Sequence, residues 1–110
     1  MIAVSAGFDS NGLLVRCHVE GHANSAPRGM DTVCAAVSVL LRSFARCLEG
    51  RAGIDASFYA PERGVFNFES KYSEAGRAFL FAAGCFLFEG LSSIAEEFPQ
   101  FCKLNVEHIK

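Results

Sequence analysis

The stretch IAVSAGFDSNGLLVRCHVE, residues 2–20, decides how the chain begins to fold. Residues 2–8 and 13–20 place apolar residues in alternation with polar ones, which is typical of strands. Between them, DSNG at residues 9–12 combines side chains that hydrogen-bond locally with a glycine that can adopt a positive φ angle. The stretch therefore predicts two strands joined as a hairpin. Alternation in the second strand places Val15, Cys17 and Val19 on one face, and Leu14, Arg16, His18 and Glu20 on the other.

The rest of the chain predicts two helices, a second hairpin and a final strand. A loop at residues 21–30 is followed by Asp31, whose carboxylate is a good N-cap for the exposed amides of a helix. Ser73 opens a second, longer helix, which ends before Pro99. The elements expected after the first hairpin are a helix at about 32–48, strands at 54–60 and 65–70, a helix from about 73 to 98 and a strand at 102–110.

The order of these elements, β-β-α-β-β-α-β, predicts an α+β fold. Two helices that each follow a hairpin can cover one face of a mixed or antiparallel sheet, which gives a two-layer sandwich. The chain has 110 residues, which fits one domain and leaves little room for two. We therefore expect residues 1–110 to form a single domain.

Both helices carry apolar stripes, and the second helix is apolar on nearly all sides. Such a helix is usually buried on more than one side. Surplus apolar surface over residues 79–98 is explained by a core plus a dimer interface, or by a groove for a partner protein, and we favour the first explanation. The expected stripes are Val33, Val37, Leu40, Leu41, Phe44 and Leu48 in the first helix, and Leu80, Ala83, Leu87, Leu91, Ile94 and Phe98 in the second.

Composition and charge exclude several classes of function. A net charge of −2, a pI near 5.9 and scattered Lys and Arg residues argue against direct binding to nucleic acid. The N-terminus lacks the pattern of a signal peptide, and no 18 consecutive residues are apolar, so we expect no membrane association. Five widely spaced cysteines without a secretion signal predict reduced thiols and a cytoplasmic location. We expect the four cysteines other than Cys34 to be small core residues.

The stretch GHANSAPRGMDTVCAAVSVLL, residues 21–41, places a histidine and a cysteine on either side of a loop. If Asp31 is the N-cap, Cys34 lies at about the third helical position, where the helix dipole and free amides stabilise a thiolate. The same amides can bind the oxyanion of a tetrahedral intermediate. The loop is long enough to bring His22 within hydrogen-bond reach of the sulfur, so the two residues could be the base and the nucleophile of acyl transfer.

Other interpretations stay open from these residues alone. Cys34 could be a buried small residue and His22 a surface residue, although Cys34 lies off the apolar stripe of its helix. A metal site has little support, because Cys17 and His18 point to opposite faces of a strand and no C-x-x-C pair is present. Asp31 disfavours a nearby thiolate unless its carboxylate caps the helix or pairs with His22.

The motif around these residues resembles the ribosomal-processing cysteine protease family, Prp. The family pattern is G-H-A, a glycine-bearing loop, and then D-x-V-C-A with a serine four residues after the cysteine. The spacing from histidine to cysteine, the overall length, the two hairpins and the C-terminal strand also fit, so the resemblance covers essentially the whole chain. The matching residues are Gly21, His22, Ala23, Asp31, Val33, Cys34, Ala35 and Ser38.

The resemblance implies a bacterial cytoplasmic endopeptidase, usually a homodimer, that works without a cofactor or metal. Its substrate would be the precursor of the twenty-seventh protein of the large ribosomal subunit, from which it removes an N-terminal extension. Cys34 would be the nucleophile and His22 the general base. Asp31 could cap the helix or orient His22, and Ser38 could bond near the site or to the Cys34 carbonyl. The flexible loop that covers the substrate would include Gly21, Ala23, Asn24, Pro27 and Gly29.

A competing hypothesis comes from a different class of protein. The surplus apolar surface of the second helix would also suit a non-catalytic, dimeric, ribosome-associated interaction module. The two classes differ in their thiols. An enzyme has one cysteine that alkylates much faster than the other four, whereas an interaction module has no such outlier.

Overall fold

The computed structural model describes residues 1–21, 30–62 and 64–109 of the chain. The predicted order of elements is confirmed, and their ends differ from the predicted ends by only a few residues. The elements are β1 (Ile2–Phe8), β2 (Leu14–Glu20), α1 (Met30–Leu48), β3 (Ile54–Tyr59), β4 (Val65–Tyr72), α2 (Glu74–Glu97) and β5 (Cys102–His108).

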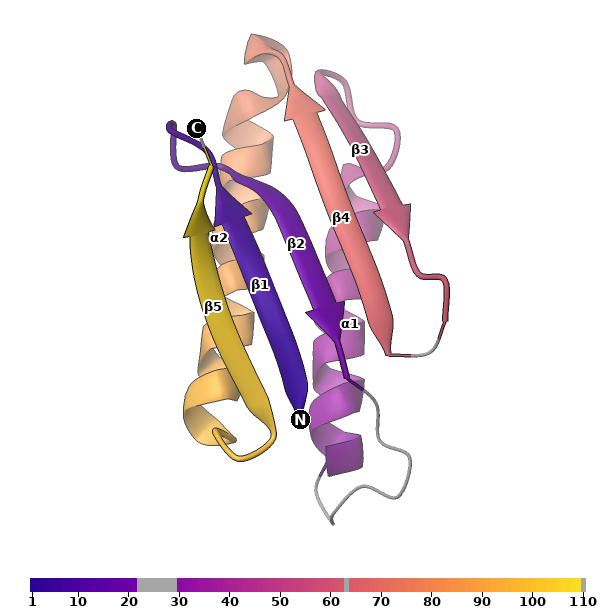
Figure 1. Cartoon of the computed structure of the whole chain (residues 1–110). Coiled ribbons are helices and arrows are strands. Elements are labelled where there is room, and N and C mark those ends of the chain that lie inside the picture. Colours follow the sequence, from indigo (N-terminus) through magenta and orange to yellow (C-terminus); the bar gives the residue numbers. More distant parts are fainter. Residues whose placement is uncertain (22–29, 63, 110) are drawn as a thin grey trace.

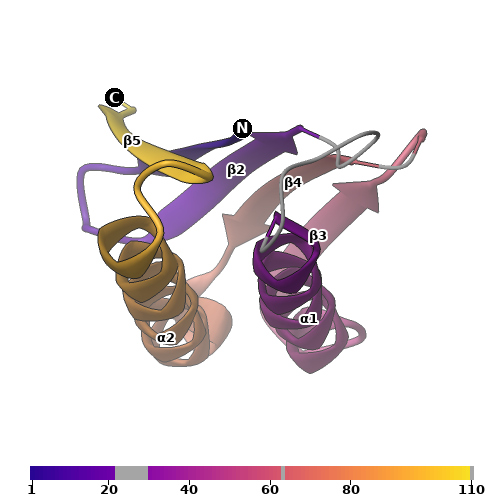
Figure 2. The same ribbon diagram turned by 90° about the horizontal axis from the view of Figure 1, so that it is seen from below.

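The strands form one five-stranded mixed sheet in the order β3-β4-β2-β1-β5 (Figure 1). Neighbouring strands are antiparallel, except that β1 and β5 are parallel. Both helices pack on the same face of the sheet, as the view along the helices shows (Figure 2). Because parallel strands need a long connection, α1 links β2 to β3 across β4, and α2 links β4 to β5 across β2 and β1. The α+β two-layer prediction is therefore confirmed.

The second strand contains a β-bulge that the alternation of its sequence did not reveal. Gly7 pairs with Arg16 and Phe8 pairs with Leu14, so Val15 is an extra residue in β2. An extra residue reverses the side on which the preceding residues lie. Leu14 is therefore buried against α2, close to Gly84, and the prediction that it lies on the opposite face from Cys17 is wrong.

Aromatic rings from α1, β3 and β4 pack together in the core. Phe68 in β4 is 1% exposed, and its ring packs edge-on against Phe44 of α1 with centroids 4.9 Å apart. The same ring stacks on Phe58 of β3 at 5.2 Å. The predicted stripe of α1 is largely confirmed: Val33, Val37, Leu41, Phe44 and Leu48 are buried, and Leu40 is partly buried.

Replacing Phe68 with alanine should destabilise the fold strongly. Truncating a buried Phe leaves a cavity, and such changes lower the free energy of unfolding by about 3–5 kcal/mol. Chemical denaturation monitored by circular dichroism measures the change. Tyr59→Ala is the control, because Tyr59 is 64% exposed and its truncation should cost far less. Equal losses in the two variants would contradict this account of the core.

The second helix buries one face rather than several. Its buried residues follow one stripe, while Phe81 and Phe86 are 47% and 75% exposed. The prediction that α2 is buried on more than one side is therefore wrong for the single chain. By length and composition, α2 is the one helix in the described ranges that is apolar enough to cross a membrane. Of the apolar 18-residue stretch of α2 that meets this criterion, 28% is buried. The buried stripe that packs against the sheet is Gly76, Leu80, Gly84, Leu87 and Leu91.

A hydrogen-bonded cluster fixes the turn between β1 and β2 to the end of β4. The Asp9 carboxylate accepts hydrogen bonds from the Tyr72 hydroxyl and from the backbone amides of Asn11 and Leu13, the latter two at 3.0 Å. Burial by itself would raise the pKa of Asp9. The three hydrogen bonds, helped by the charge of Arg77, nevertheless hold the pKa of this carboxyl below its ordinary value.

This cluster predicts a component of the acid sensitivity of the fold. A carboxyl whose pKa is lowered by folding contributes stability above its unfolded pKa of about 3.8, and the contribution is lost as the pH falls through the lower folded value. Asp9→Asn should therefore be less stable than the parent at neutral pH. Its stability should also fall less steeply below about pH 4. Thermal unfolding across a pH series checks this, and parallel curves for the two proteins would contradict it.

Candidate active site

The first helix begins earlier than its sequence predicted. It starts at Met30, so Asp31 lies inside its first turn and the prediction that Asp31 is the N-cap is wrong. Cys34 is consequently the fifth helical residue rather than about the third. In an α-helix the amide of the fifth residue bonds to the carbonyl of the first, so the free amides belong to the residues before Cys34.

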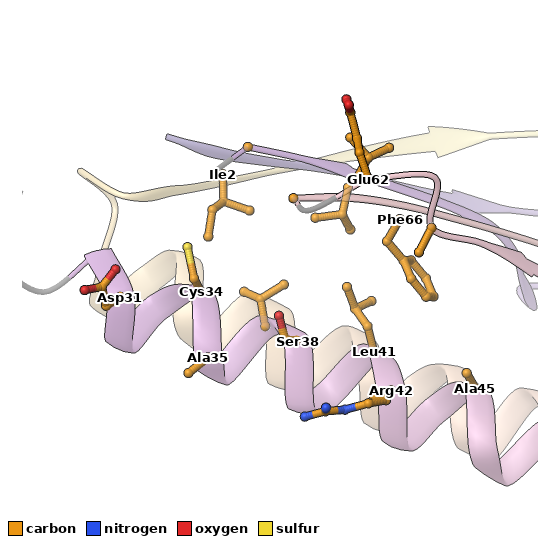
Figure 3. Close-up of a pocket in the computed structure, with 16 residues that line it drawn as sticks. Ile2, Asp31, Cys34, Ala35, Ser38, Leu41, Arg42, Ala45, Glu62 and Phe66 are labelled. Carbon is orange, nitrogen blue, oxygen red and sulfur yellow. The ribbon is translucent and has the colours of Figure 1, made fainter. Parts of the chain in front are cut away.

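A pocket with a volume of about 680 Å³ lies between α1 and the sheet. Cys34, Asp31 and Ser38 line it from the helix, as Figure 3 shows. The opposite side comes from the start of β1, the end of β2, the start of β4, and the connection between β3 and β4. Residues on these other segments are Ile2, Val19, Gly21, Ala60, Glu62, Gly64, Val65 and Phe66.

The Cys34 side chain is partly buried and points from the helix toward the sheet (Figure 3). Asp31 lies one turn before it and Ser38 one turn after it, and both are exposed. In the described part of the chain, no hydrogen bond joins the Ser38 hydroxyl to the Cys34 carbonyl, whereas the Ser93 hydroxyl bonds to the Glu89 carbonyl at 2.9 Å. The structure therefore brings three of the four predicted catalytic and supporting residues to one pocket.

Gly21 marks the edge of the pocket from which the loop departs. Its amide donates a hydrogen bond to the Gly64 carbonyl at 2.9 Å, and its φ angle is +140°. A Cβ atom at this position would lie 2.4 Å from the Met1 carbonyl oxygen and 2.8 Å from the Ile2 Cα. Only glycine fits this conformation and this close approach. Gly21 therefore lies close against β1 and the β3–β4 connection, and its assignment to a flexible cover stays a prediction.

The remaining predicted loop residues cannot be placed by this geometry. His22, Ala23, Asn24, Pro27 and Gly29 lie outside the described residues, so the pairing of His22 with Cys34 stays a prediction.

The other four cysteines divide into two classes. Cys17 and Cys102 are buried, and burial raises the pKa of both thiols, that of Cys17 to about 12. Cys47 and Cys85 are exposed on the helices, so the prediction that all four are core residues is wrong for these two. Of the five thiols, only that of Cys34 lines the 680 Å³ pocket.

His18 lies on the face of the sheet that the helices leave open. Its Nδ1 atom lies 2.5 Å from the Asn67 Oδ1 atom, and its Nε2 atom lies 3.3 Å from a Glu20 carboxylate oxygen. Both partners are acceptors that favour the protonated ring, so the pKa of His18 is raised, chiefly by Asn67. Cys17 faces the core, which confirms that the two neighbouring residues point to opposite faces. Within residues 1–21, 30–62 and 64–109, no three His, Cys, Asp or Glu side chains are grouped as metal ligands.

Several pocket residues escaped the sequence interpretation. Ile2, Ala60 and Phe66 were predicted only as strand residues, and Glu62 and Gly64 only as part of the connection between the strands of the second hairpin. They reach the pocket because β4 pairs with β2 rather than with β3 alone, which places the β3–β4 connection beside Gly21. A sheet order of this kind is not encoded in local patterns, so no local signal could have identified these residues.

Comparison with known families agrees with this geometry. Residues 1–103 match the family described as cysteine protease Prp. The chain belongs to this family. It is thus a cysteine protease, and the interpretation as a non-catalytic interaction module is not supported. No curated protein sequence matches it.

Solved structures share the fold of this Prp-family chain. SMU.848 from Streptococcus mutans is 24% identical, with a TM-score of 0.81 over 99% of this chain and 96% of that one. An essential ribosomal processing protease Prp from S. aureus, in complex with a substrate peptide, is 21% identical, with a TM-score of 0.82 over 97% and 100% of the two chains. The same protease with a covalently linked product peptide is 23% identical, with a TM-score of 0.80 and the same coverage. At these identities the likeness establishes the fold.

Proposed function

We propose that this protease removes the N-terminal extension of the twenty-seventh protein of the large ribosomal subunit, with Cys34 as the nucleophile and His22 as the general base. The observation that carries the proposal is the position of Cys34 in the pocket of a chain that matches the Prp family over residues 1–103. The S. aureus protease of the same fold has been seen with a substrate peptide and with a covalently linked product peptide, which supports peptide cleavage.

Two described residues support the pairing of His22 with Cys34. Gly21 and Cys34 line the same pocket, and His22 directly follows Gly21 in the chain. Asp31 lines the pocket from the first turn of α1, so we assign its carboxylate to orienting the His22 ring.

The proposed reaction is acyl transfer in two steps. His22 accepts the Cys34 proton as the sulfur attacks the scissile carbonyl carbon, and the carbonyl electron pair moves to oxygen. The oxyanion then collapses, the C–N bond breaks, and His22 gives its proton to the departing amine. In the second step, His22 takes a proton from water, the hydroxide attacks the thioester, and the thiolate leaves with recovery of its proton.

The free amides of the first turn of α1 are the proposed donors to the oxyanion. They precede Cys34, because its own amide is engaged within the helix. The helix dipole at this end of α1 also favours negative charge, such as that of the oxyanion. Ser38 lies one turn beyond Cys34 and lines the pocket, so we assign its hydroxyl to a hydrogen bond with the substrate.

The walls of the pocket fit an apolar peptide segment. Val19, Val37, Leu41 and Phe66 line it, and the charged head of Glu62 points away from α1 (Figure 3). The reaction needs no metal or cofactor, because the thiol and the imidazole supply the nucleophile and the proton transfers. The proposed substrate is the precursor peptide of the ribosomal protein.

Cleavage of a synthetic peptide tests this function. The peptide spans the N-terminus of the ribosomal protein from the same organism, and mass spectrometry identifies the products. We expect one cut, which releases the extension, and no cut in a peptide of the same composition with scrambled order. Failure to cut the native peptide at any site would refute the proposed substrate.

The setting of the reaction is also a proposal. We propose a cytoplasmic homodimer without direct contact to nucleic acid or membrane. The net charge of −2 gives no support to nucleic-acid binding. The exposed aromatic rings of Phe81 and Phe86 on α2 support a dimer interface. Sedimentation velocity of the parent protein and of Phe86→Asp tests the dimer. The parent should sediment as a dimer, and the aspartate carboxylate introduced at position 86 should dissociate it into monomers.

A further inference from the structure

Strand β3 forms one edge of the sheet, and it lacks the usual protection of an edge (Figure 1). Edge strands are commonly blunted by lysine, by proline or by a β-bulge. The sequence of β3, IDASFY, contains neither lysine nor proline, and its pairing with β4 is regular. The strand is therefore a regular template on which a further strand can pair.

Three residues of β3 direct their backbone amides and carbonyls away from β4. The Ser73 amide donates to the Gly53 carbonyl at 2.9 Å, which places these two residues at a hydrogen-bonded position of the antiparallel pair. Such positions alternate along a strand, so the backbone groups of Ile54, Ala56 and Phe58 face outward. The Ile54 amide accordingly bonds to a carbonyl of the preceding turn, at 3.2 Å, and not to β4. Within the residues that the structure describes, the outward groups of Ala56 and Phe58 have no neighbouring strand.

A second groove, with a volume of about 460 Å³, lies beside this edge, between β3 and the last turns of α1. Ile54, Ala56 and Phe58 line it and are only partly buried. The residues whose backbone groups face outward thus also present apolar side chains to the groove. A strand added to β3 would bond to this backbone and place alternate side chains in the groove.

The two ends of the groove carry opposite charges. Residues 49–53 connect α1 to β3, so the two elements run in opposite directions and the end of α1 lies beside the start of β3 (Figure 1). Arg42 and Arg46 line the groove one helical turn apart, toward the end of β3. Glu49 and Asp55 line it at the start of β3. All four side chains are exposed, and the ion pairs found in the described ranges lie elsewhere.

We propose that the β3 edge binds an extended segment of a partner protein, paired antiparallel to β3, the more stable arrangement of two strands. The segment begins with an acidic residue beside Arg42 and Arg46. It continues with apolar residues at alternate positions and ends with a basic residue beside Glu49 and Asp55, so its charges complement those of the groove. Arg42 also lines the pocket of Cys34, so the bound segment adjoins the reaction site without using its thiol.

A synthetic peptide, acetyl-Glu-Thr-Val-Thr-Val-Thr-Lys-amide, tests this proposal. Amide hydrogen exchange followed by NMR gives the exchange rate of each residue. Saturating peptide should slow exchange of the Ala56 and Phe58 amides by about tenfold or more, whereas the Ser57 amide, which already faces β4, should change little. The matched control is the peptide with its Glu and Lys interchanged, which should bind about tenfold more weakly. Unchanged exchange at both amides, or equal binding of the two peptides, would overturn the proposal.

Two variants of the protein test the backbone and the charge separately. Ala56→Pro removes an outward amide that β4 does not use, so the protein should stay folded and lose the peptide. Arg46→Glu, a milder surface change, should weaken binding by about tenfold. Lys103→Glu, the same change of charge on the exposed side of β5, should leave binding within about twofold of the parent. Binding at parent strength in folded Ala56→Pro or in Arg46→Glu would contradict the proposal.

Cleavage distinguishes a partner from a substrate. The parent protease should bind the peptide and leave it intact, and Cys34→Ala should bind it with the same affinity. If the parent cuts the peptide, or if Cys34→Ala loses binding, the groove belongs to the substrate site and the partner proposal is wrong.

Discussion

Replacing Cys34 with alanine should abolish peptide cleavage and lower kcat/KM by at least about 10³-fold. The nucleophile of a covalent mechanism cannot be replaced by a neighbouring group, because Ser38 lies a full turn further along the pocket. The variant should keep its fold, since Cys34 is only partly buried and alanine is a good helix former. Peptide cleavage followed by mass spectrometry measures the activity, and thermal unfolding checks the fold.

Cys85→Ala is the matched control for this variant. Cys85 also lies on a helix, but it is exposed on α2 and does not line the pocket of Cys34. Its replacement should leave kcat/KM within about twofold of the parent, as expected for a surface change away from the site. Cleavage by Cys34→Ala at a rate near that of the parent would show that another residue is the nucleophile.

The second large effect is expected for His22→Ala. Loss of a general base and acid typically lowers the rate by about 10²–10⁴-fold. Because the imidazole would also assist ionisation of the thiol, the pH profile of Cys34 alkylation should move to higher pH in the variant. A residue that only supports the loop would lower activity without moving this profile.

His18→Ala provides the corresponding control. His18 lies on the open face of the sheet, where it bonds to Asn67 and Glu20, and it does not line the pocket. Its removal should change neither kcat/KM nor the alkylation profile of Cys34. If His22→Ala behaves like His18→Ala in both measurements, the assignment of the base is wrong.

The elements of this fold were predictable because each depends on a local pattern. Alternation identified the strands, and the stripe from Val33 to Leu48 identified α1 and its buried face. The errors arise where one extra residue changes the register of a strand, or where tertiary packing determines where an element begins and which of its residues are buried. The bulge at Val15 places Leu14 on the core side, and the interpretation of Asp31 as the N-cap placed the start of α1 two residues late.

The candidate site was predictable on one side only. Cys34, Asp31 and Ser38 are close in sequence on one helix, so their spacing was enough to bring them together. Ile2 and Phe66 come from strands whose neighbours are fixed by the order of the sheet. Exposure of Cys47 and Cys85 likewise depends on which faces of the two helices meet the sheet, which no local pattern determines.

The central claim is that Cys34 is an activated thiol in this pocket, and alkylation by iodoacetamide across a pH series tests it most directly. Peptide mass mapping gives the rate at each cysteine, with the exposed Cys47 and Cys85 as references for accessible thiols and the buried Cys17 and Cys102 as protected ones. We predict that Cys34 reacts fastest, and at a lower pH than Cys47 and Cys85, although it is less exposed. A rate at Cys34 equal to or below those of Cys47 and Cys85 at every pH would contradict the account.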